Sequence, residues 1–517
     1  MTEPAKVVAA RDEPGPATRA PLPRPGPSGL LCEMNSSFPV DAGILFGAAL
    51  VVVGVVVGGV ADRYRLPGLV FFLALGMVVA DDGFALIHFD DTELAQNVAI
   101  VALVVILFQG GLATAPEAVR RAGAPAALLA TVGVVVTAAV AAGSAALAFD
   151  LPASSSLLIG AVVASTDAAA VFSALRRQTM PARVRDLLQM ESGLNDPVAV
   201  ILTIGMVEVW RGQPGPAGWI AFSLLQLVGG LAVGLTIGLG ARVALRRLQL
   251  PSASSYPVLA LAIAGLSYGV ATEVGSSGFL AVYLTGLVLG RKRRLVRSLL
   301  HFHDGLAAAA EAVLFLMLGL LVFPSRLLDV IGPALIVAVG LMLVARPVAV
   351  ALCLPWFRFN RRELTLVSWA GLRGAVPIVL ATIPLTAGHP DGSLVFNVVF
   401  VAVLASLIVQ AGTVGALAKR LGFAEEVSGA HADVAVLDAL VADLIELRLT
   451  SESPVLGTRL REHGLPNGAR VALVVRNGQT IVPDGDLVLT ADDVLLVAVA
   501  PETAPETLIA WATHQPE

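Results

Sequence analysis

The sequence predicts an all-α polytopic membrane protein with about 13 transmembrane helices, followed by a small cytoplasmic α+β domain. Of its 517 residues, 56% are hydrophobic and only 14% are charged, and the mean hydropathy is +0.82. Apolar runs long enough to cross about 30 Å of hydrocarbon recur between residues 40 and 420. After about residue 430 they give way to short strand-like segments. A composition this apolar excludes a soluble globular protein.

The first 39 residues differ from the rest, because they are rich in proline and polar residues and have no apolar core. We predict a disordered N-terminal tail at 1–39 and not a cleaved signal peptide. The sequence leaves open whether translation starts at Met1 or at Met34. The cysteines Cys32 and Cys353 are too few for a disulfide framework or a metal site, and we expect no cofactor.

Residues 40–420 are predicted to form the transmembrane domain. Alternate connections between its spans hold most of the arginine and lysine residues, whereas the connection at 81–91 is acidic. The positive-inside rule then places the N-terminus outside and the C-terminus in the cytoplasm, in the plasma (inner) membrane. One missed helix would reverse the alternation, so its regularity supports the count. The predicted spans are 40–62, 66–83, 94–114, 123–148, 155–177, 187–209, 217–241, 254–272, 277–290, 305–323, 327–355, 363–386 and 392–418.

A linker at 421–434 is predicted to lead into a soluble domain at 435–505, with a C-terminal tail at 506–517. The domain has no Gly-rich phosphate loop, so no motif indicates a nucleotide site. Runs of apolar and β-branched residues between turn residues predict strands, and one longer segment predicts a helix. We expect strands at 443–450, 469–478, 485–490 and 492–500, and a helix at 452–464.

Several ionisable side chains fall deep inside the predicted spans, where a charge is costly and marks a functional candidate. Asp167, Asp196 and Arg373 lie near the midpoints of the fifth, sixth and twelfth spans. Glu191 and Arg346 lie at a matching depth nearer the cytoplasm, which predicts a structural ion pair between them and leaves Arg373 near Asp167. These three carboxylates and two guanidinium groups leave one excess negative charge. A single monovalent cation or proton would neutralise it.

Oxygen atoms gather around the carboxylate that has no assigned partner, Asp196. Ser192 lies four residues before it, on the same side of the helix. Alkali cations are hard ions that prefer oxygen ligands. We predict that the Asp196 and Asp167 carboxylates, the Ser192 hydroxyl and a backbone carbonyl near Thr166 bind a monovalent cation, and that a proton competes for the same oxygens. Asn195, directly before Asp196, is counted with this cation and proton site.

Two spans carry helix-weakening residues at mid-depth. They are Ser165, Thr166 and Asp167 in the fifth span and Gly371, Gly374 and Pro377 in the twelfth. The odd number of spans that separates them would give them opposite directions across the membrane. An inverted repeat of spans one to six and eight to thirteen, with broken helices crossing at a midplane site, would produce this arrangement.

Two other charged residues admit more than one interpretation. Arg373 is equally open to a structural role and to gating or tuning the proton affinity of the site. Glu311, in the tenth span, could line a pathway, but we favour a glutamate that is satisfied by a partner or reaches the cytoplasm. The basic segment at 291–297 is explained by topology and anionic membrane lipids, and requires no nucleic acid.

Four motifs, in this order, resemble those of the monovalent cation:proton antiporters of the NhaP type. They are STDAAAVFSAL (165–175), ESGLNDPVAV (191–200), the arginine of ARPVAV (345–350) and GLRGAVP (371–377). The likeness covers roughly residues 40 to 420, and the segment at about 435–505 looks like a TrkA-C (RCK-C) regulatory domain. Sodium-type members usually have a proline after the aspartate of STDAAA. Its absence, together with the TrkA-C-like domain, makes the chain most similar to the bacterial potassium/proton antiporters.

The resemblance implies that Asp196 is the shared cation and proton site and that Asp167 and the Thr166 carbonyl assist it. Electrogenic relatives have a second aspartate where this chain has Asn195, so Asn195 implies electroneutral exchange of one cation for one proton. Gln109 stands where relatives often carry an acid, which leaves the role of the third span open.

The sequence thus predicts a secondary active antiporter, and no enzyme, that exchanges potassium for protons in cation and pH homeostasis. Sodium stays open as the transported ion, because alkali ions share the same ligand chemistry. A regulated cation channel is less favoured, since the chain has no TVGYG-like filter and ionisable residues at mid-depth suit proton exchange. We expect a homodimer whose C-terminal domain regulates transport by binding a small molecule.

Overall fold

The computed structural model divides into two compact units, with the boundary after Glu425. It describes residues 68–423 and 443–499 with short gaps, together with Ala48, residues 51–54, Val56 and Trp511. The gaps are 81, 88, 90, 176–179, 213–214, 249–251, 253, 291–292, 450–452, 463–464, 466–467, 477–478 and 492. The predicted N-terminal tail, most of the first span and nearly all of the predicted linker and C-terminal tail lie outside the described residues.

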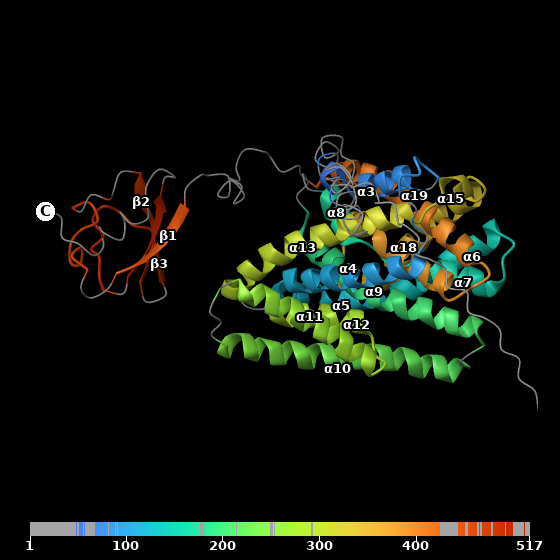
Figure 1. The fold of residues 1–517 in the computed structure, drawn as a ribbon, viewed down its shortest axis with the longest axis horizontal. Helices are drawn as coiled ribbons and strands as arrows, with labels where there is room; N and C mark the ends of the chain where they lie inside the picture. Colours follow the sequence, from blue (N-terminus) through green and yellow to red (C-terminus); the bar gives the residue numbers. More distant parts are fainter. Residues whose placement is uncertain are drawn as a thin grey trace, which may run out of the picture. The chain divides into compact units, whose positions relative to one another are not determined.

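The first unit is built from helices, drawn in Figure 1. Its first half contains α3 (Gly68–Val79), α4 (Thr92–Ala113), α5 (Pro116–Leu128), the π-helical turn η2 (Leu129–Gly133), α6 (Val134–Ala148), α7 (Ala153–Val162), α8 (Ala168–Ala174), α9 (Ala182–Trp210) and α10 (Pro216–Arg247). Its second half contains α11 (Ser255–Glu273), α12 (Gly278–Leu289), α13 (Arg293–Leu320), α14 (Pro324–Leu327), α15 (Ile331–Gly340), the π-helical turn η3 (Leu341–Ala345), α16 (Arg346–Cys353), the 3-10 turn η4 (Pro355–Phe357), α17 (Arg361–Trp369), α18 (Ala375–Thr386) and α19 (Gly392–Arg420).

Among the described residues, 8 helical segments are long and apolar enough to cross a membrane. Shorter apolar helices are Gly68–Val79, Ala153–Val162, Gly278–Leu289 and Ala375–Thr386. Helices occupy every predicted span from the second to the thirteenth, but the number that crosses the membrane stays a prediction. The largest shift is at α13, which begins at Arg293 and so takes part of the basic segment into the helix.

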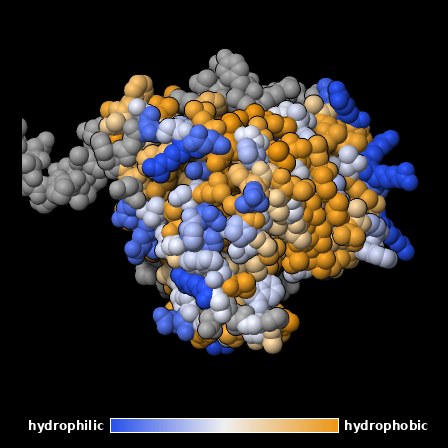
Figure 2. Space-filling model, turned by 90° about the vertical axis from the view of Figure 1, so that its right-hand side faces the viewer, coloured by the Kyte–Doolittle hydropathy of each residue, from blue (hydrophilic) through white to orange (hydrophobic). Residues whose placement is uncertain are grey.

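Hydrophobic side chains cover large parts of the surface of the first unit. Figure 2 shows broad hydrophobic areas on one face, separated by patches of hydrophilic residues. Helix α10 lies along one edge of the helical unit (Figure 1), and only 11% of its most apolar stretch is buried inside the chain. Exposing such a large apolar surface to water is unfavourable. Helix α10 is therefore suited to contact with lipid or with another apolar surface.

Glycines allow some helices to approach closely. A side chain at Gly111 would collide with the carbonyl oxygen of Tyr283, and one at Gly286 would collide with that of Phe108. Small residues permit such backbone contact between membrane helices, where the packing of atoms drives association. The close contact between α4 and α12 brings Gln109 and Tyr283 to the same cavity.

Two helices of the first unit are broken at mid-length, as the sequence predicts. The chain is not helical at residues 163–167, between α7 and α8, or at residues 370–374, between α17 and α18. The two breaks meet, because the backbone N–H of Asp167 donates a hydrogen bond of 2.8 Å to the carbonyl oxygen of Leu372. Backbone groups freed inside a membrane need such partners. The inverted repeat that would relate the two breaks stays a prediction.

The second unit holds a four-stranded antiparallel sheet in the order β1-β4-β2-β3. The strands are β1 (Asp443–Arg448), β2 (Ala469–Arg476), β3 (Gln479–Ile481) and β4 (Val494–Val499). The predictions of strands near 443–450, 469–478 and 492–500 are confirmed. The short strand β3 was not predicted.

Two predictions for the second unit are wrong. Where described, 452–464 is not helical, and 485–490 forms an isolated bridge at Val488 instead of a strand. Gly457 has a φ of +76°, which a helix does not allow. Its N–H donates to the carbonyl oxygen of Leu489, and that of Leu460 donates to Leu487. The backbone groups of the two segments therefore hydrogen-bond to each other, and these tertiary hydrogen bonds replace those of a helix.

The buried carboxylate of Asp493 links strand β2 to the segment before β4 in the second unit. Asp493 is fully buried and accepts hydrogen bonds of 2.8 Å from Nε and Nη2 of Arg476 and from the backbone N–H of Thr490. Burial opposes the ionised form, but the hydrogen bonds from Arg476 and Thr490 outweigh it and lower the pKa of Asp493 below its ordinary value.

We predict that Asp493→Asn lowers the unfolding free energy of the second unit by about 2 kcal/mol, because charge-assisted hydrogen bonds are lost. Since the folded-state pKa is lowered, this stabilisation is present above the unfolded pKa of about 4 and is lost as the pH falls through the folded value. Hydrogen exchange of β2 and β4 in the full chain measures the effect. Asp486→Asn, at an exposed ion pair, is the control. Equal exchange in both variants would contradict the prediction.

Candidate functional site

A cavity of about 240 Å³ lies beside the break between α7 and α8. Residues of α4, α9, α12, α13 and α18 complete its wall. Its polar lining includes Gln109, Thr166, Asp167, Ser192, Asp196 and Glu311. The structure thus brings together four of the five residues predicted to bind a cation or proton. The fifth, Asn195, does not line the cavity.

Asp167 is held in place by the start of α8. It is the N-cap of that helix, and its Oδ1 accepts hydrogen bonds from the backbone N–H groups of Ala169 (2.8 Å) and Ala170 (3.2 Å). An aspartate is favoured there because it satisfies free N–H groups and faces the positive end of the helix dipole. Any side chain at Gly374 would collide with the other oxygen, Oδ2. Glycine at 374 is therefore required for the Asp167 carboxylate to occupy this position.

Asp196 lies within the continuous helix α9 and is 7% exposed. Its Oδ1 has no hydrogen-bond partner, and no described side chain pairs with its charge. Pro197 follows it and has no N–H, so the carbonyl oxygen of Gly193 lacks its usual helical hydrogen bond. Gly193 also lines the cavity. A buried carboxylate without a partner is costly, so this position calls for a bound proton or cation.

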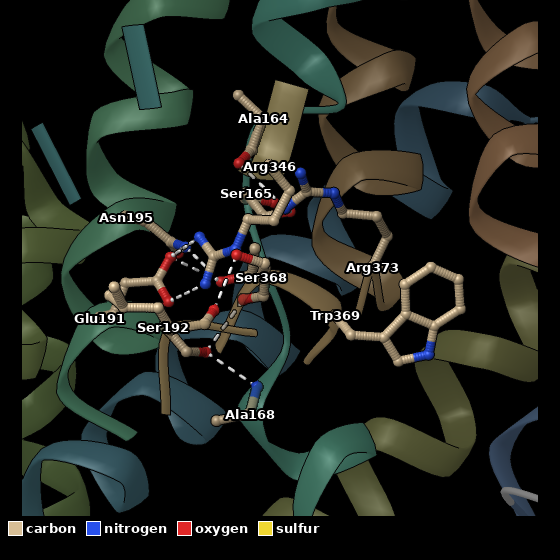
Figure 3. Close-up of polar contacts among 12 residues, drawn as sticks. Ala164, Ser165, Ala168, Glu191, Ser192, Asn195, Arg346, Ser368, Trp369 and Arg373 are labelled. Atoms are coloured by element: carbon tan, nitrogen blue, oxygen red, sulfur yellow. Dashed lines mark hydrogen bonds and ion pairs between the residues drawn. The ribbon is translucent and has the colours of Figure 1, made fainter. Parts of the chain in front are cut away.

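Ser192 ties α9 to the neighbouring break. Its hydroxyl donates to the carbonyl oxygen of Thr166 (3.0 Å) and accepts from the backbone N–H of Ala168 (3.2 Å), as Figure 3 shows in part. Through these bonds the Ser192 oxygen and the carbonyl oxygen of Thr166 each use one of their two lone pairs. Each oxygen therefore keeps one lone pair that a cation could bind.

Glu191 and Arg346 form a buried ion pair next to Thr166. Nη1 and Nη2 of Arg346 each donate a hydrogen bond of 2.7 Å to one oxygen of Glu191, and the two side chains are 4% and 1% exposed (Figure 3). Thr166 Oγ1 also donates to Glu191 (3.2 Å). Asn195 Nδ2 donates to Thr166 Oγ1 (2.6 Å) and to Glu191 (3.2 Å). Asn195 thus belongs to the network around the ion pair.

The wide turn η3 and a glycine shape the position of Arg346. Pro347 cannot donate a helical hydrogen bond, and the π-helical turn at Leu341–Ala345 comes just before it. A side chain at Gly371, in the break between α17 and α18, would lie 2.6 Å from Nε of Arg346. The second break thus leaves room for the guanidinium group of the ion pair.

Arg373 contacts the end of α7 and not the Asp167 carboxylate. Its buried Nη1 donates to the carbonyl oxygens of Ser165 (2.8 Å) and Ala164 (3.2 Å) (Figure 3). A cation is favourable there, because carbonyl groups at a helix end carry partial negative charge. Arg373 does lie near Asp167, whose backbone N–H donates to the carbonyl oxygen of the adjacent Leu372. The Arg373 side chain, however, contacts the carbonyls that precede Asp167 in the same break and no oxygen of the Asp167 carboxylate.

Two groups of functional contacts were not predicted. Ser406 accepts a hydrogen bond from the backbone N–H of Arg373 (3.1 Å), and Gln410 donates to the carbonyl oxygen of Trp369 (2.9 Å), so α19 satisfies the second break. Ser406 and Gln410 are polar residues four apart in an otherwise apolar span, and this spacing could have indicated a shared polar contact. Gln109 donates a hydrogen bond of 2.7 Å to Asp304, a pairing that no sequence pattern indicates.

Models of two known families match the chain. The family described as "Sodium/hydrogen exchanger, transmembrane" matches residues 47–420, and the TrkA-C domain matches residues 444–508. The matched ranges follow the two units.

Curated relatives cover most of the chain. The K(+)/H(+) antiporter NhaP of Alkalimonas amylolytica is 39% identical over 477 residues, which is 90% of this chain and 83% of the relative. The K(+)/H(+) antiporter NhaP2 of Shewanella sp. (strain MR-4) is 37% identical over 486 residues, which is 92% of this chain and 84% of the relative. The Na(+)/H(+) antiporter NhaH of Halobacillus dabanensis is 30% identical over 293 residues, 53% of this chain and 70% of the relative.

A solved structure has the same fold. The sodium proton antiporter MjNhaP1 from Methanocaldococcus jannaschii, determined at pH 8, superposes with a TM-score of 0.66 at 22% identity. The match covers 74% of this chain and 100% of that chain. At this identity the likeness concerns the fold alone.

We predict that Arg346→Gln destabilises the first unit by about 3–5 kcal/mol, because it leaves the Glu191 carboxylate buried and unpaired. The double variant Glu191→Gln/Arg346→Gln should recover part of this loss. Thermal unfolding of the purified protein in detergent measures the order of stability. Arg211→Gln removes an exposed ion pair with Glu208 and serves as the control. If the two single losses simply add in the double variant, the prediction is wrong.

Proposed function

The chain belongs to the family of transmembrane sodium/hydrogen exchangers, and from this we propose that it is a secondary active antiporter that exchanges potassium for protons across the plasma membrane. The observation that carries the proposal is Asp196, a buried carboxylate that lines a cavity and pairs with no described side chain. Only a bound cation or proton neutralises it. Exchange follows if the two compete for the same oxygens.

The charges of Glu191, Asp167 and Arg373 near the site already have fixed partners. Glu191 is neutralised by Arg346, and Asp167 faces the N-terminal end of α8. Arg373 is held by carbonyl oxygens. Of these four groups, Asp196 is therefore the one whose occupant can change without disrupting another contact. One cation or one proton at Asp196 gives the same net charge, which supports electroneutral exchange of one for one.

Oxygen atoms near Asp196 suit an alkali ion. The cavity is lined by Asp196, Asp167, Thr166 and Gly193, which offer carboxylate and carbonyl oxygens. The two helix breaks meet beside these groups, and broken helices that meet in this way line the ion sites of many transporters. Potassium is favoured because the long relatives at 37–39% identity are named K(+)/H(+) antiporters. Sodium is the second candidate, supported by the shorter match to a protein named Na(+)/H(+) antiporter.

The second unit is the proposed regulator of transport. Its match to the TrkA-C domain supports binding of a small molecule there. The charge distribution of the connecting segments supports a cytoplasmic position for this unit and an external N-terminus. The exposed apolar surface of α10 is suited to contact with membrane lipid or with a second copy in a homodimer.

We expect Asp196→Asn to abolish exchange, because the amide binds neither a proton nor a cation in place of the carboxylate. The purified protein is placed in liposomes with an imposed pH gradient. Added potassium should collapse this gradient, and the rate of collapse should be the same when the voltage is clamped. Asp329→Asn, an exposed substitution of the same type, should transport like the parent. Lower pH should raise the potassium concentration needed for half-maximal rate, by up to about tenfold per pH unit for one competing proton.

A response to sodium alone would keep the mechanism and change the ion. Transport by Asp196→Asn at the parent's rate would refute the proposed site, and current that accompanies exchange would refute electroneutrality.

We expect removal of the second unit to change the affinity, rate or pH profile of exchange while exchange itself persists, because the site lies wholly in the first unit. A protease site inserted between residues 426 and 442 allows the same liposomes to be measured before and after cleavage. The parent chain treated with the protease is the control. Regulation by this unit is ruled out if cleavage leaves all three properties unchanged.

A further inference from the structure

Glu311 is a second carboxylate without a partner in the cavity that contains Asp196. It lies on α13, and the neighbouring residues Leu314 and Phe315 line the same cavity. Within the described part of the chain, no hydrogen bond or ion pair satisfies the Glu311 carboxylate. The Asp167 carboxylate also lines this cavity. The expectation of a glutamate satisfied by a partner is therefore not met among these residues.

A polar route leads from Glu311 to the surface. Asp304 lies seven residues earlier on α13, on the same face and about 10 Å away along the helix axis. Asp304 is exposed, and it accepts the hydrogen bond of 2.7 Å from Gln109. Gln109 itself lines the cavity. Gln109 therefore joins the cavity to an exposed carboxylate, on the side of α13 where the basic segment lies.

Three carboxylates, those of Asp167, Asp196 and Glu311, line this small cavity and cannot all stay ionised without a large cost. Like charges at short range in a poorly solvated space repel each other, and one of them takes up a proton. Arg346 and Arg373, the buried basic residues nearby, are already engaged by Glu191 and by carbonyl oxygens. The Asp167 carboxylate is stabilised by two backbone N–H groups of α8. In the absence of a cation, Asp196 and Glu311 together therefore hold at least one proton.

Building on the proposed function, we propose that Glu311 is the group that receives the proton displaced from Asp196 when a cation enters, and passes it to water near Asp304. Protonated Asp196 and ionised Glu311 meet an entering potassium ion. The O–H bond at Asp196 breaks, a new O–H bond forms at Glu311, and potassium binds the Asp196 carboxylate. Glu311 then loses the proton to water. One positive charge has entered and one has left, so charge is balanced.

This assignment separates two tasks inside the cavity. Asp196 selects between the cation and the proton, whereas Glu311 only conducts the proton. Gln109 holds no exchangeable charge and fixes the position of Asp304 by its hydrogen bond. Removing the Glu311 carboxylate should therefore slow exchange without abolishing cation binding.

The test uses Glu311→Gln in the full-length protein, with Glu311→Asp and the exposed Glu273→Gln as matched variants. Potassium binding is followed by potassium-dependent thermal stabilisation in detergent, and transport by potassium uptake into liposomes. We expect Glu311→Gln to bind potassium within about threefold of the parent but to transport at least about tenfold more slowly, the size of a lost proton-transfer group. Added imidazole, a small proton carrier, should restore part of the rate. Glu311→Asp and Glu273→Gln should stay close to the parent.

Three results would overturn the assignment. They are a parent-like rate in Glu311→Gln, loss of its potassium binding, and a slow rate that imidazole does not raise. The last two would make Glu311 a cation ligand or a structural residue. The proposed function is judged separately, by the parent and by Asp196→Asn. A parent that exchanges no cation for protons refutes the function itself, whereas an active parent, an inactive Asp196→Asn and a normal Glu311→Gln refute the role of Glu311 alone.

Discussion

The buried ion pair between Glu191 and Arg346 is the contact on which the arrangement of the site depends. It joins α9 to α16, and through the hydroxyl of Thr166 it also fixes the break between α7 and α8. Two charges in a membrane interior are tolerated only when geometry and hydrogen bonds compensate for lost solvation. Here both oxygens of Glu191 accept from Arg346, and Asn195 and Thr166 add further donors. The pair holds in place the helix that carries Asp196, which can then remain without a partner of its own.

The two broken helices solve a related problem with different partners. Each break exposes N–H and C=O groups that lipid cannot satisfy. The end of α7 is covered by the Arg373 guanidinium, the start of α8 by Asp167, and the end of α17 by Gln410. Residues that look like candidates for ion binding in the sequence are therefore also the residues that make the breaks possible. Asp167 and Arg373 have structural tasks whether or not an ion is present.

Depth along a helix explains what could be predicted from the sequence. The rise per residue is constant, so the matching depths of Glu191 and Arg346 identified partners 155 residues apart. Depth does not say which way a side chain points, and so Asn195 was assigned to the cation site, and the contacts of the Arg373 guanidinium with the carbonyls of Ala164 and Ser165 were not predicted. The wrong helix at 452–464 has another cause. Its backbone hydrogen bonds go to a segment near Leu487, which no local pattern reveals.

The N-cap geometry of Asp167 has a consequence for how the site would hold an ion. Oδ1 is engaged by two backbone N–H groups, and Oδ2 lies against Gly374. A cation would therefore meet one oxygen of Asp167, whose place is set by the backbone of α8. Asp196, in contrast, has no such anchor. The site therefore combines one carboxylate whose position is set by backbone hydrogen bonds with another that has no such contacts.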